Sequence, residues 1–304
     1  MVSSAAPVRD DAGFPPLGRL SAWSPAPAIK ASMWLHAAAL GILAAEPADW
    51  PGVAGLVAAN HALLACGMRP RSAMLGRNLS RVVPGGPGGD AVVLTFDDGP
   101  DPEVTPRVLD LLDRHGAKAS FFVLGQRAAR HASILRDVVA RGHSVENHTH
   151  DHPLSFAGWS PGAMLREIRR AQEAIAEACG QAPQYFRPPA GLRSPLLDPV
   201  LAMAGLSLVS WTRRGYDTVA SRPGQVYRRL TRKLGAGDIL LLHDRATHGG
   251  CMALRVLPRL LARLAAEGLS AVSLRSALAA APPGAIAGEA AGPACRPPGA
   301  HASR

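Results

Sequence analysis

The chain has 304 residues, of which 47% are hydrophobic and 18% are charged, and this balance excludes wholesale disorder. Its length suits one domain of ordinary barrel size with additional segments, and its four widely spaced cysteines exclude a CxxC redox motif and a cysteine-rich zinc finger. The formal net charge of +10 favours an anionic partner, such as a phospholipid headgroup, a phosphate-bearing substrate or nucleic acid. Residues 1–30 contain five prolines among small and polar residues, so we expect a flexible leader there.

Two apolar stretches follow, over residues 31–45 and 52–68, with a short acidic turn between them. Each approaches the roughly 20 residues that cross a bilayer as a helix, and basic residues flank the pair on both sides. We therefore expect a transmembrane helical hairpin over residues 31–69, with Trp34 and Trp50 near the membrane interfaces. Because basic flanks favour the cytoplasm, the rest of the chain is expected on that side of the membrane. Two alternatives fit these stretches: a pair of buried alanine-rich helices, or a signal peptide.

A proline- and glycine-rich linker is expected over residues 70–90, so a domain boundary falls there. In residues 91–280, short apolar runs alternate with helical patterns, which predicts a parallel sheet that is either closed into a barrel or wound open. Residues 281–304 are rich in proline, alanine and glycine, and we expect a disordered tail. The expected strands cover residues 91–96, 120–124, 143–147, 185–186, 206–211, 239–243 and 270–274, and the expected helices residues 104–114, 126–140, 161–179, 196–204, 225–234 and 253–266.

Polar residues cluster at the carboxyl ends of these expected strands. In parallel α/β barrels the catalytic site lies at this edge of the sheet, so independent strands would deliver acids, histidines and an arginine to one rim. The residues concerned are Asp97 and Asp98, His148 to His152, Arg187, Trp211 to Asp217, and His243 with Asp244.

The spacing of two of these histidines indicates a metal site. His148 and His152 are four residues apart, so one helical turn would place both imidazoles on the same side, whereas His150 would face away. With one carboxylate they form a site that keeps a position open for water. The adjacent Asp97 and Asp98 stand at a turn, where one can bind the metal and the other can take a proton. The plain alternatives are a solvated loop with histidines and an ordinary Asp-Gly turn.

Arg187 and His243 are candidates for the remaining chemistry. Arg187 precedes two prolines that stiffen the chain, so its side chain could orient a carboxylate by bidentate bonding; the alternative is a surface arginine. His243 follows an apolar run and precedes Asp244, so it could serve as a general acid; the alternative is a hydrogen-bonded histidine at a strand end.

In this order, these residues resemble the polysaccharide deacetylase family, the carbohydrate esterases with a NodB homology domain. The similarity covers about 60% of the chain, and the family's fold is a distorted (β/α) barrel, here preceded by the expected two-helix membrane hairpin. The motifs that carry it are TFDDG at residues 95–99, HTHDH at 148–152, RPPAG at 187–191 and LLLHD at 240–244.

The resemblance implies a role for each matching residue. Asp97 would be the catalytic base, and Asp98, His148 and His152 would bind the metal. Arg187 would orient the base, Leu240 would line the acetyl pocket, and His243 would be the general acid.

Two motifs depart from the family pattern. Ala190 replaces the family's tyrosine, although its N–H could still stabilise the oxyanion. In the fourth motif, which begins at Trp211, Arg214 stands where the family has its first aspartate and Thr218 where it has its second tryptophan. These departures leave the substrate open, and Asp217 is our candidate for the acid that balances His243.

The expected function is a metal-dependent hydrolase that removes an N-acyl group, above all N-acetyl, from an amino sugar in a polysaccharide or a lipid-linked glycan. The expected metal is Zn²⁺, with Co²⁺, Ni²⁺ or Mn²⁺ as alternatives, and the expected location is a bacterial inner membrane. A competing hypothesis is a membrane-tethered, catalytically degenerate sugar-binding module. The basic run over residues 213–233 is either a solvated helix face or a contact for anionic lipid or sugar phosphate. No nucleic-acid motif accompanies the charge, and the oligomeric state is not predicted.

Overall fold

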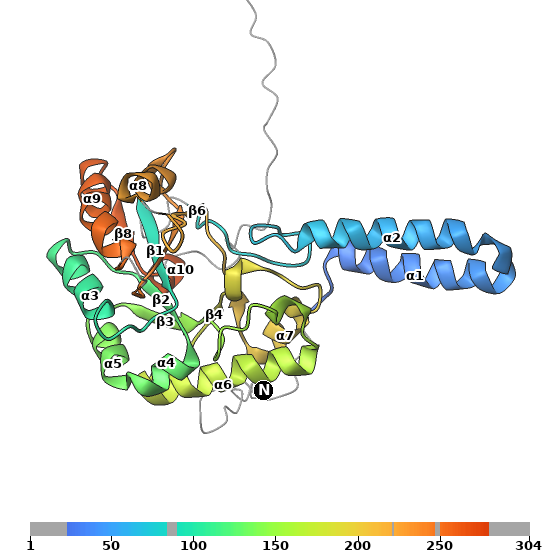
Figure 1. Ribbon diagram of the computed structural model, residues 1–304, viewed down its shortest axis with the longest axis horizontal. Helices are drawn as coiled ribbons and strands as arrows, with labels where there is room; N and C mark the ends of the chain where they lie inside the picture. Colours follow the sequence, from blue (N-terminus) through green and yellow to red (C-terminus); the bar gives the residue numbers. More distant parts are fainter. Residues whose placement is uncertain (1–22, 84–89, 221, 247–249, 280–304) are drawn as a thin grey trace, which may run out of the picture.

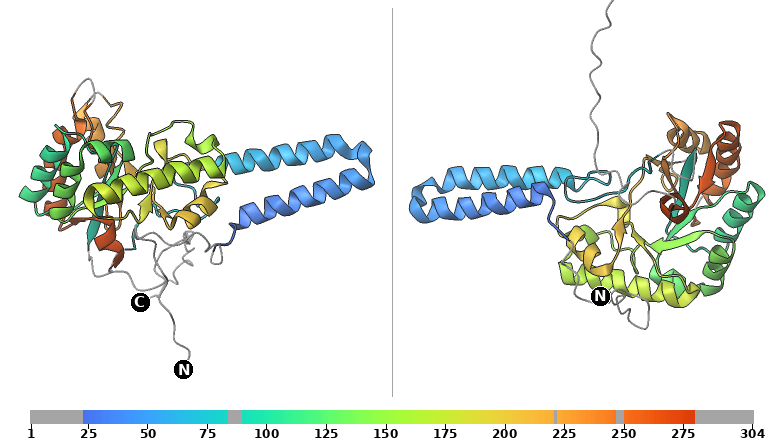
Figure 2. Two further views of the ribbon diagram at one scale, coloured as in Figure 1. Left: turned by 90° about the horizontal axis from the view of Figure 1, so that it is seen from below. Right: turned by 180° about the vertical axis from the view of Figure 1, so that it is seen from behind.

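The computed structural model describes residues 23–83, 90–220, 222–246 and 250–279, so the predicted tail and most of the predicted leader lie outside these ranges. Two long helices, α1 (Pro27–Ala45) and α2 (Trp50–Gly67), form a hairpin joined by the 3₁₀ turn η2 (Pro47–Asp49). The hairpin projects from an α/β domain in every view (Figures 1 and 2).

The α/β domain is built on one sheet of parallel strands that forms a half-barrel. The strand order is β5-β4-β3-β2-β1-β7-β6, and β8 pairs with the first half of β1. The strands are β1 (Ala91–Asp97), β2 (Ser120–Val123), β3 (Ser144–Asn147), β4 (Tyr185–Phe186), β5 (Ser207–Leu208), β6 (Arg213–Arg214), β7 (Ile239–His243) and β8 (Ser270–Val272). The predicted parallel alternation is confirmed, but the expected strand over residues 206–211 is only two residues long, and β6 was not predicted.

Helices cover the outer side of this sheet (Figure 1). They are α3 (Thr105–Arg114), α4 (Gly125–Arg130), α5 (Ala132–Ala140), α6 (Pro161–Cys179), α7 (Leu197–Ala204), α8 (Pro223–Thr231) and α9 (Met252–Ala266). The last helix, α10 (Leu274–Ala279), packs instead on the inner side through Leu274 and its neighbours. The 3₁₀ turns are η3 (Phe156–Gly158) and η4 (Pro189–Gly191). The expected helix over residues 126–140 is divided into α4 and α5, because His131 leaves helical geometry with φ −128° and ψ 42°.

The ends of α6 follow directly from its sequence. The Ser160 side chain accepts a hydrogen bond from the Ala163 N–H, Pro161 occupies the first turn, and Gly180 ends the helix in the left-handed conformation. One side of the helix is apolar and buried, so packing on the sheet fixes its orientation.

Alternation along the strands sorts side chains into two clusters and sets which of them reach the site. Leu94 and Phe96 of β1 belong to the outer cluster beneath the helices, whereas Val93 belongs to the inner cluster with Phe122 and Trp211. Because neighbouring side chains of a strand point to opposite faces, residue 97 shares the inner face with residues 93 and 95.

The helical hairpin exposes large apolar side chains: 77% of Trp34 and 69% of Leu40 are accessible. The two helices contact each other through a hydrogen bond from Asn60 to Ser32 (2.8 Å) and through the rings of His36 and His61, 5.1 Å apart. Among the described helices, α1 alone has the length and hydropathy of a membrane span. The predicted helix pair is present, but its two-span membrane character is not confirmed.

Residues 70–83 connect the hairpin to the half-barrel. The Arg193 N–H donates to the Met68 carbonyl (3.0 Å), and the Arg71 guanidinium donates to the Thr212 carbonyl (3.2 Å). Leu79 forms a parallel bridge with Val209, and Leu75, Leu79 and Val82 are buried. This part of the segment expected to be a linker therefore packs on the sheet beside β5.

Candidate active site

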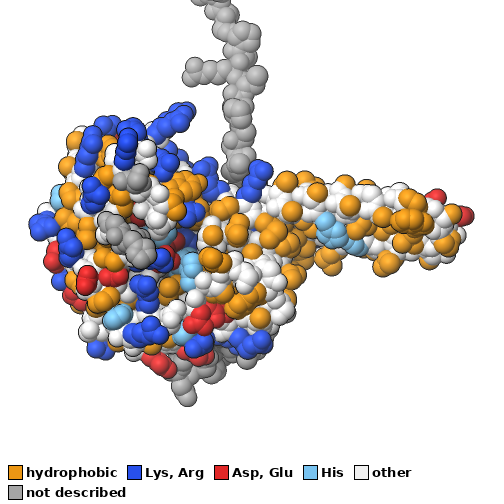
Figure 3. Space-filling model, viewed as in Figure 1, with side chains coloured by type: hydrophobic (Ala, Val, Ile, Leu, Met, Phe, Trp, Pro, Cys, Tyr) orange, Lys and Arg blue, Asp and Glu red, His pale blue; other side chains and the backbone are white. Residues whose placement is uncertain are grey.

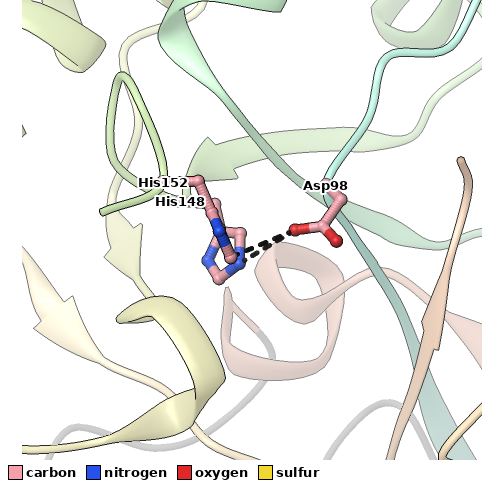
Figure 4. A group of neighbouring side chains, drawn as sticks. All are labelled: Asp98, His148 and His152. Atoms are coloured by element: carbon pink, nitrogen blue, oxygen red, sulfur yellow. Dashed lines mark ion pairs between the residues drawn. The ribbon is translucent and has the colours of Figure 1, made fainter. Parts of the chain in front are cut away.

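Three potential metal ligands converge at the carboxyl ends of β1 and β3 (Figure 4). The Asp98 Oδ1 lies 3.4 Å from the Nε2 of His148 and 3.4 Å from the Nε2 of His152. Asp98 directly follows β1 in the left-handed conformation (φ 74°), which turns its carboxylate toward the rim. His148 directly follows β3, so two strands of the sheet position most of the group.

The two histidines meet through a loop, and the helical turn expected for residues 148–152 is wrong. Thr149 and His152 are both left-handed, with φ 70° and 56°. The side chain of Asn147 accepts the Thr149 N–H (2.8 Å), and the Thr149 Oγ1 accepts the His152 N–H (3.0 Å), so the loop folds back on itself. His150 is directed elsewhere, as predicted, and its Nδ1 lies 2.7 Å from Asp151.

The protonation pattern of the group suits metal binding. The Nδ1 of His148 lies 2.7 Å from the Arg187 carbonyl oxygen; because that oxygen only accepts, Nδ1 donates and Nε2 keeps its lone pair. Burial acts to raise the pKa of Asp98, but the surrounding imidazoles, His148 foremost, hold it well below its usual range when they are protonated, so the carboxylate stays ionised. Burial lowers the pKa of His152, and so does His148.

The residues present fit a divalent metal ion. The Asp98 Oδ1 is buried and has no hydrogen-bond partner among the described residues, and one ligand atom from each of the three side chains lies within 4.8 Å of the others. Two imidazoles and a carboxylate form a mixed nitrogen and oxygen donor set, which Zn²⁺ and similar ions accept while keeping a position open.

Asp97 is held by the fully buried Arg187. The Arg187 guanidinium donates to the Asp97 Oδ1 (2.6 Å) and to the Thr95 hydroxyl (3.0 Å), and its other side donates to the Ser210 carbonyl (2.8 Å). The Phe122 ring lies 4.0 Å beneath the guanidinium carbon. The second oxygen of Asp97 lies 3.9 Å from the Nε2 of His148, so Arg187 fixes this carboxylate beside the metal ligands.

His243, the last residue of β7, is paired with Asp217. The two oxygens of Asp217 lie 2.9 Å from the His243 Nδ1 and 2.8 Å from its backbone N–H, which donates to the carboxylate. Burial acts to lower the pKa of His243, but the hydrogen bond and charge of Asp217, with the charges of Asp97 and Asp98, raise it above its ordinary value. The structure therefore brings Asp217 to the histidine for which it was the candidate acid.

The predicted role of Leu240 in an acetyl pocket is wrong, because its side chain faces the other side of the sheet. Leu240 belongs to the outer cluster beneath α8 and α9, whereas Leu241 belongs to the inner cluster with Trp211. Side chains alternate along β7, so Leu241 shares a face with His243 and Leu240 does not.

Trp211 and Ala190 occupy neighbouring parts of the rim. Trp211 is buried, and its ring lies so close to Gly191 that a side chain at that glycine would collide with it. Ala190 is exposed and left-handed (φ 55°), a conformation that is uncommon for alanine.

Sequence reasoning missed the buried carboxyl group of Asp244. The Thr105 hydroxyl donates to it (2.6 Å), and burial raises the pKa of Asp244 to about 8. A side chain at Gly99 would collide with this carboxyl, so the glycine lets the Asp98 turn approach the end of β7. The only sequence signal was the position of Asp244 next to His243. Arg245, which also had no assigned role, lies 3.4 Å from the Asp98 Oδ2.

The fold and the site together define the class of protein. It is a parallel α/β half-barrel that carries a candidate hydrolytic metal site, an aspartate and two histidines, at the carboxyl ends of its strands. The family model for polysaccharide deacetylase matches residues 85–209. A chitooligosaccharide deacetylase from Sinorhizobium fredii is 41% identical over 54% of this chain and 77% of the relative. A peptidoglycan-N-acetylglucosamine deacetylase from Bacillus cereus is 32% identical over 61% of this chain and 67% of the relative.

Solved structures agree with these relatives. A family 4 carbohydrate esterase from Streptomyces lividans is 34% identical, with a TM-score of 0.56 over 62% of this chain and 93% of that one. The chain belongs to the polysaccharide deacetylase family, as its motifs predicted. It is accordingly an enzyme, a hydrolase that acts on carbon–nitrogen bonds other than peptide bonds.

Proposed function

We propose that this enzyme removes the N-acetyl group from an amino sugar, with one divalent metal ion, Zn²⁺, at Asp98, His148 and His152. The observation that carries the proposal is the meeting of this group with two further pairs, Asp97 with Arg187 and His243 with Asp217, at one edge of the sheet. The names of the relatives, which refer to chitooligosaccharide and to N-acetylglucosamine in peptidoglycan, support an N-acetylated hexosamine as the substrate.

Each of the three proposed ligands offers one donor atom to the metal. The Nε2 lone pairs of the two histidines and the unpartnered oxygen of Asp98 point to a common position. A divalent cation bound there would supply Lewis acidity, which polarises an acyl oxygen and lowers the pKa of water to about 7.

Asp97 acts as the general base in this proposal. Arg187 occupies one oxygen of its carboxylate and leaves the other facing the metal ligands, where it can accept a proton from the attacking water. Because Arg187 is completely buried and also bonded to backbone carbonyls, it fixes the orientation of the base.

His243 acts as the general acid. Asp217 accepts a hydrogen bond from Nδ1, so Nε2 is the nitrogen left to protonate the leaving amine. The raised pKa of His243 keeps a larger fraction of the imidazole protonated at neutral pH. The N–H of Ala190 is the proposed donor to the acyl oxygen as it gains negative charge.

The proposed location is a bacterial inner membrane, with the catalytic domain on the cytoplasmic side. The apolar helix α1 supports a membrane anchor, and the basic flanks of the hairpin support the side. Such an anchor is compatible with a lipid-linked glycan as well as with a polymer.

The test is release of acetate from N-acetylated chitooligosaccharides and from a lipid-linked N-acetylhexosamine by the full chain in detergent. We expect activity that a chelator abolishes and that added Zn²⁺ restores. Tight sugar binding without acetate release would contradict the proposal and favour the sugar-binding module. Equal activity before and after complete metal removal would contradict the metal assignment.

A further inference from the structure

Arg214 places a guanidinium on the inner face of the sheet beside the catalytic rim, which is the edge that carries Asp97 and His243. In β6 it pairs with Leu241 of β7, whose side chain belongs to the inner cluster. Paired residues of parallel strands direct their side chains to the same face, so Arg214 shares the face of Leu241 and His243. The Trp211 ring lies 5.2 Å from the guanidinium carbon of Arg214 and 5.8 Å from that of Arg187. Arg214 therefore lies next to the residues that hold the base.

A tyrosine links Arg214 to a second arginine on α8. The Tyr216 ring lies 4.9 Å from the guanidinium carbon of Arg214 and 5.3 Å from that of Arg229. Tyr216 is 47% exposed and left-handed (φ 56°), an uncommon conformation for a bulky residue. The next residue, Asp217, holds the proposed general acid, so the two cations adjoin the catalytic rim; Arg229 is exposed and Arg214 is half-buried.

Among the described residues, Arg214 and Arg229 have no carboxylate that neutralises their charge, whereas their neighbour Arg213 has one. Arg213 donates to the buried Asp238 carboxylate at 2.6 Å and is part of the fold. Within the described ranges, Arg214 and Arg229 form no ion pair, and the Nε of Arg214 is buried without a hydrogen-bond partner. A half-buried guanidinium without an ion-pair partner is unfavourable, so this position is suited to an external anion at its accessible side.

The cationic surface continues beyond the rim. An open pocket of about 570 Å³ lies along α8, and Arg229 contributes to it. The other residues that line it are Gln225, Arg228, Thr231 and Arg232. Figure 3 shows lysine and arginine side chains gathered over α8 and α9. An anionic group that reached Arg214 would thus lie in a positive potential.

We infer that Arg214 and Arg229, which both contact the Tyr216 ring, form a subsite for an oxyanion group carried by the amino-sugar substrate, either a phosphate or a carboxylate. This inference rests on the proposed function and narrows its substrate class to acidic N-acetylated sugars. The planar guanidinium fork matches two oxygens of either group. Arg214 stands where the family resemblance leads us to expect an acid, so this chain has the opposite charge at that position.

The experiment compares three matched disaccharides: N,N′-diacetylchitobiose, its 1-phosphate, and its aldonic acid, which carries a carboxylate. We expect kcat/KM for at least one anionic form to exceed that for the neutral form by about tenfold, since hydrogen bonds to charged groups are the strong ones. Preference for the phosphate alone identifies a phosphorylated substrate, and equal preference for both anions identifies a general oxyanion subsite. No preference for either anion overturns the inference.

Two variants assign the preference to this subsite. Arg214→Gln and Arg229→Gln should each reduce the ratio of anionic to neutral kcat/KM to near one, and the ratio cancels general damage to folding. Arg166→Gln, at an exposed arginine on α6 far from α8, should keep the wild-type ratio. Retention of the full preference in both subsite variants would overturn the inference.

A binding measurement separates this inference from the proposed function. Dissociation constants for the same disaccharides are measured by calorimetry with the Asp97→Asn protein and with its Arg214→Gln double variant. If wild-type protein releases no acetate from any form, the proposed function fails, while tighter binding of an anionic form that requires Arg214 still supports the subsite. Equal binding of all three forms overturns the subsite even if deacetylation is observed.

Discussion

The catalytic rim and the helical hairpin differ in which side chains they bury: the rim buries charged groups, whereas the hairpin exposes large apolar ones. At the rim, the proposed base and acid have partners within the chain: Arg187 is fully buried and bonds to Asp97 and to backbone carbonyls, and His243 bonds to Asp217. In the hairpin, large apolar side chains such as Trp34 are exposed with no partner in the described chain. The rim thus has its stabilising contacts within the chain, whereas the hairpin presents an exposed apolar surface of the kind that marks interaction sites.

The two regions are nevertheless joined at one place. The chain leaving α2 is bonded to the loop that follows Arg187, through the Met68 carbonyl and the Arg193 N–H. The Arg193 side chain also donates to the carbonyls of Ser72 and Gly76. If α1 is anchored in a membrane, this junction would therefore fix the orientation of the catalytic rim relative to the membrane surface.

Loss of the proposed base should give the largest effect. Asp97→Asn keeps the shape of the side chain but removes the proton acceptor, so turnover should fall by about 10²- to 10⁴-fold while bound metal is retained. Acetate release and metal analysis of the same preparation measure the two outcomes. Turnover near the wild-type value would show that Asp97 is not the base.

A charge introduced into the hairpin tests whether its exposed apolar surface binds a membrane. Leu40→Asp places a carboxylate in α1, where membrane insertion would cost about 2.5–3.5 kcal/mol, so association with lipid vesicles should fall strongly. Leu154→Asp is the matched control, because Leu154 is equally exposed but lies on the barrel. The measurement is co-sedimentation with vesicles, and equal association of the two variants would argue against a membrane anchor.

The junction between the two regions should have a measurable stability. Arg193→Met removes the donors to Ser72 and Gly76; the Ser72 carbonyl keeps a hydrogen bond from Asn78, but the Gly76 carbonyl loses its donor, so the free energy of unfolding should fall by about 2 kcal/mol. Denaturant unfolding of the full chain in detergent measures it. An unchanged midpoint would mean that the junction does not stabilise the chain.

The smallest expected effect is a shift in pH dependence. Asp217 raises the pKa of His243, and a general acid must be protonated, so activity should decline as the pH rises through that pKa. Asp217→Asn removes the charge, lowers the pKa of His243 and should move the alkaline limb of the kcat profile to lower pH. An alkaline limb that stays in place would assign it to another group.

The sequence predicted those parts of the fold in which local pattern and packing agree. The apolar run of β7 and the capped, amphipathic α6 were predicted at their observed bounds. In contrast, β6 consists of Arg213 and Arg214 alone, so no apolar pattern marks it, and only pairing with β7 makes it a strand.

For the site, residue identity was predictable but local geometry was not. The convergence of His148 and His152 depends on two left-handed residues, which spacing alone does not indicate. The role of Leu240 came from the family resemblance alone, because an uninterrupted apolar run has no alternation from which to infer which side chains face inward. Asp217 was the candidate partner of His243, but their contact itself depends on the position of β6, which tertiary pairing determines.

The metal content of the purified full chain tests the site most directly. After dialysis, elemental analysis should find about one Zn²⁺ per chain in the wild type and in Asp97→Asn, as expected for a mononuclear site, and almost none in Asp98→Ala. Wild-type protein without tightly bound divalent metal, or Asp98→Ala protein with the same metal content as wild type, would contradict the assignment of Asp98, His148 and His152 as its ligands.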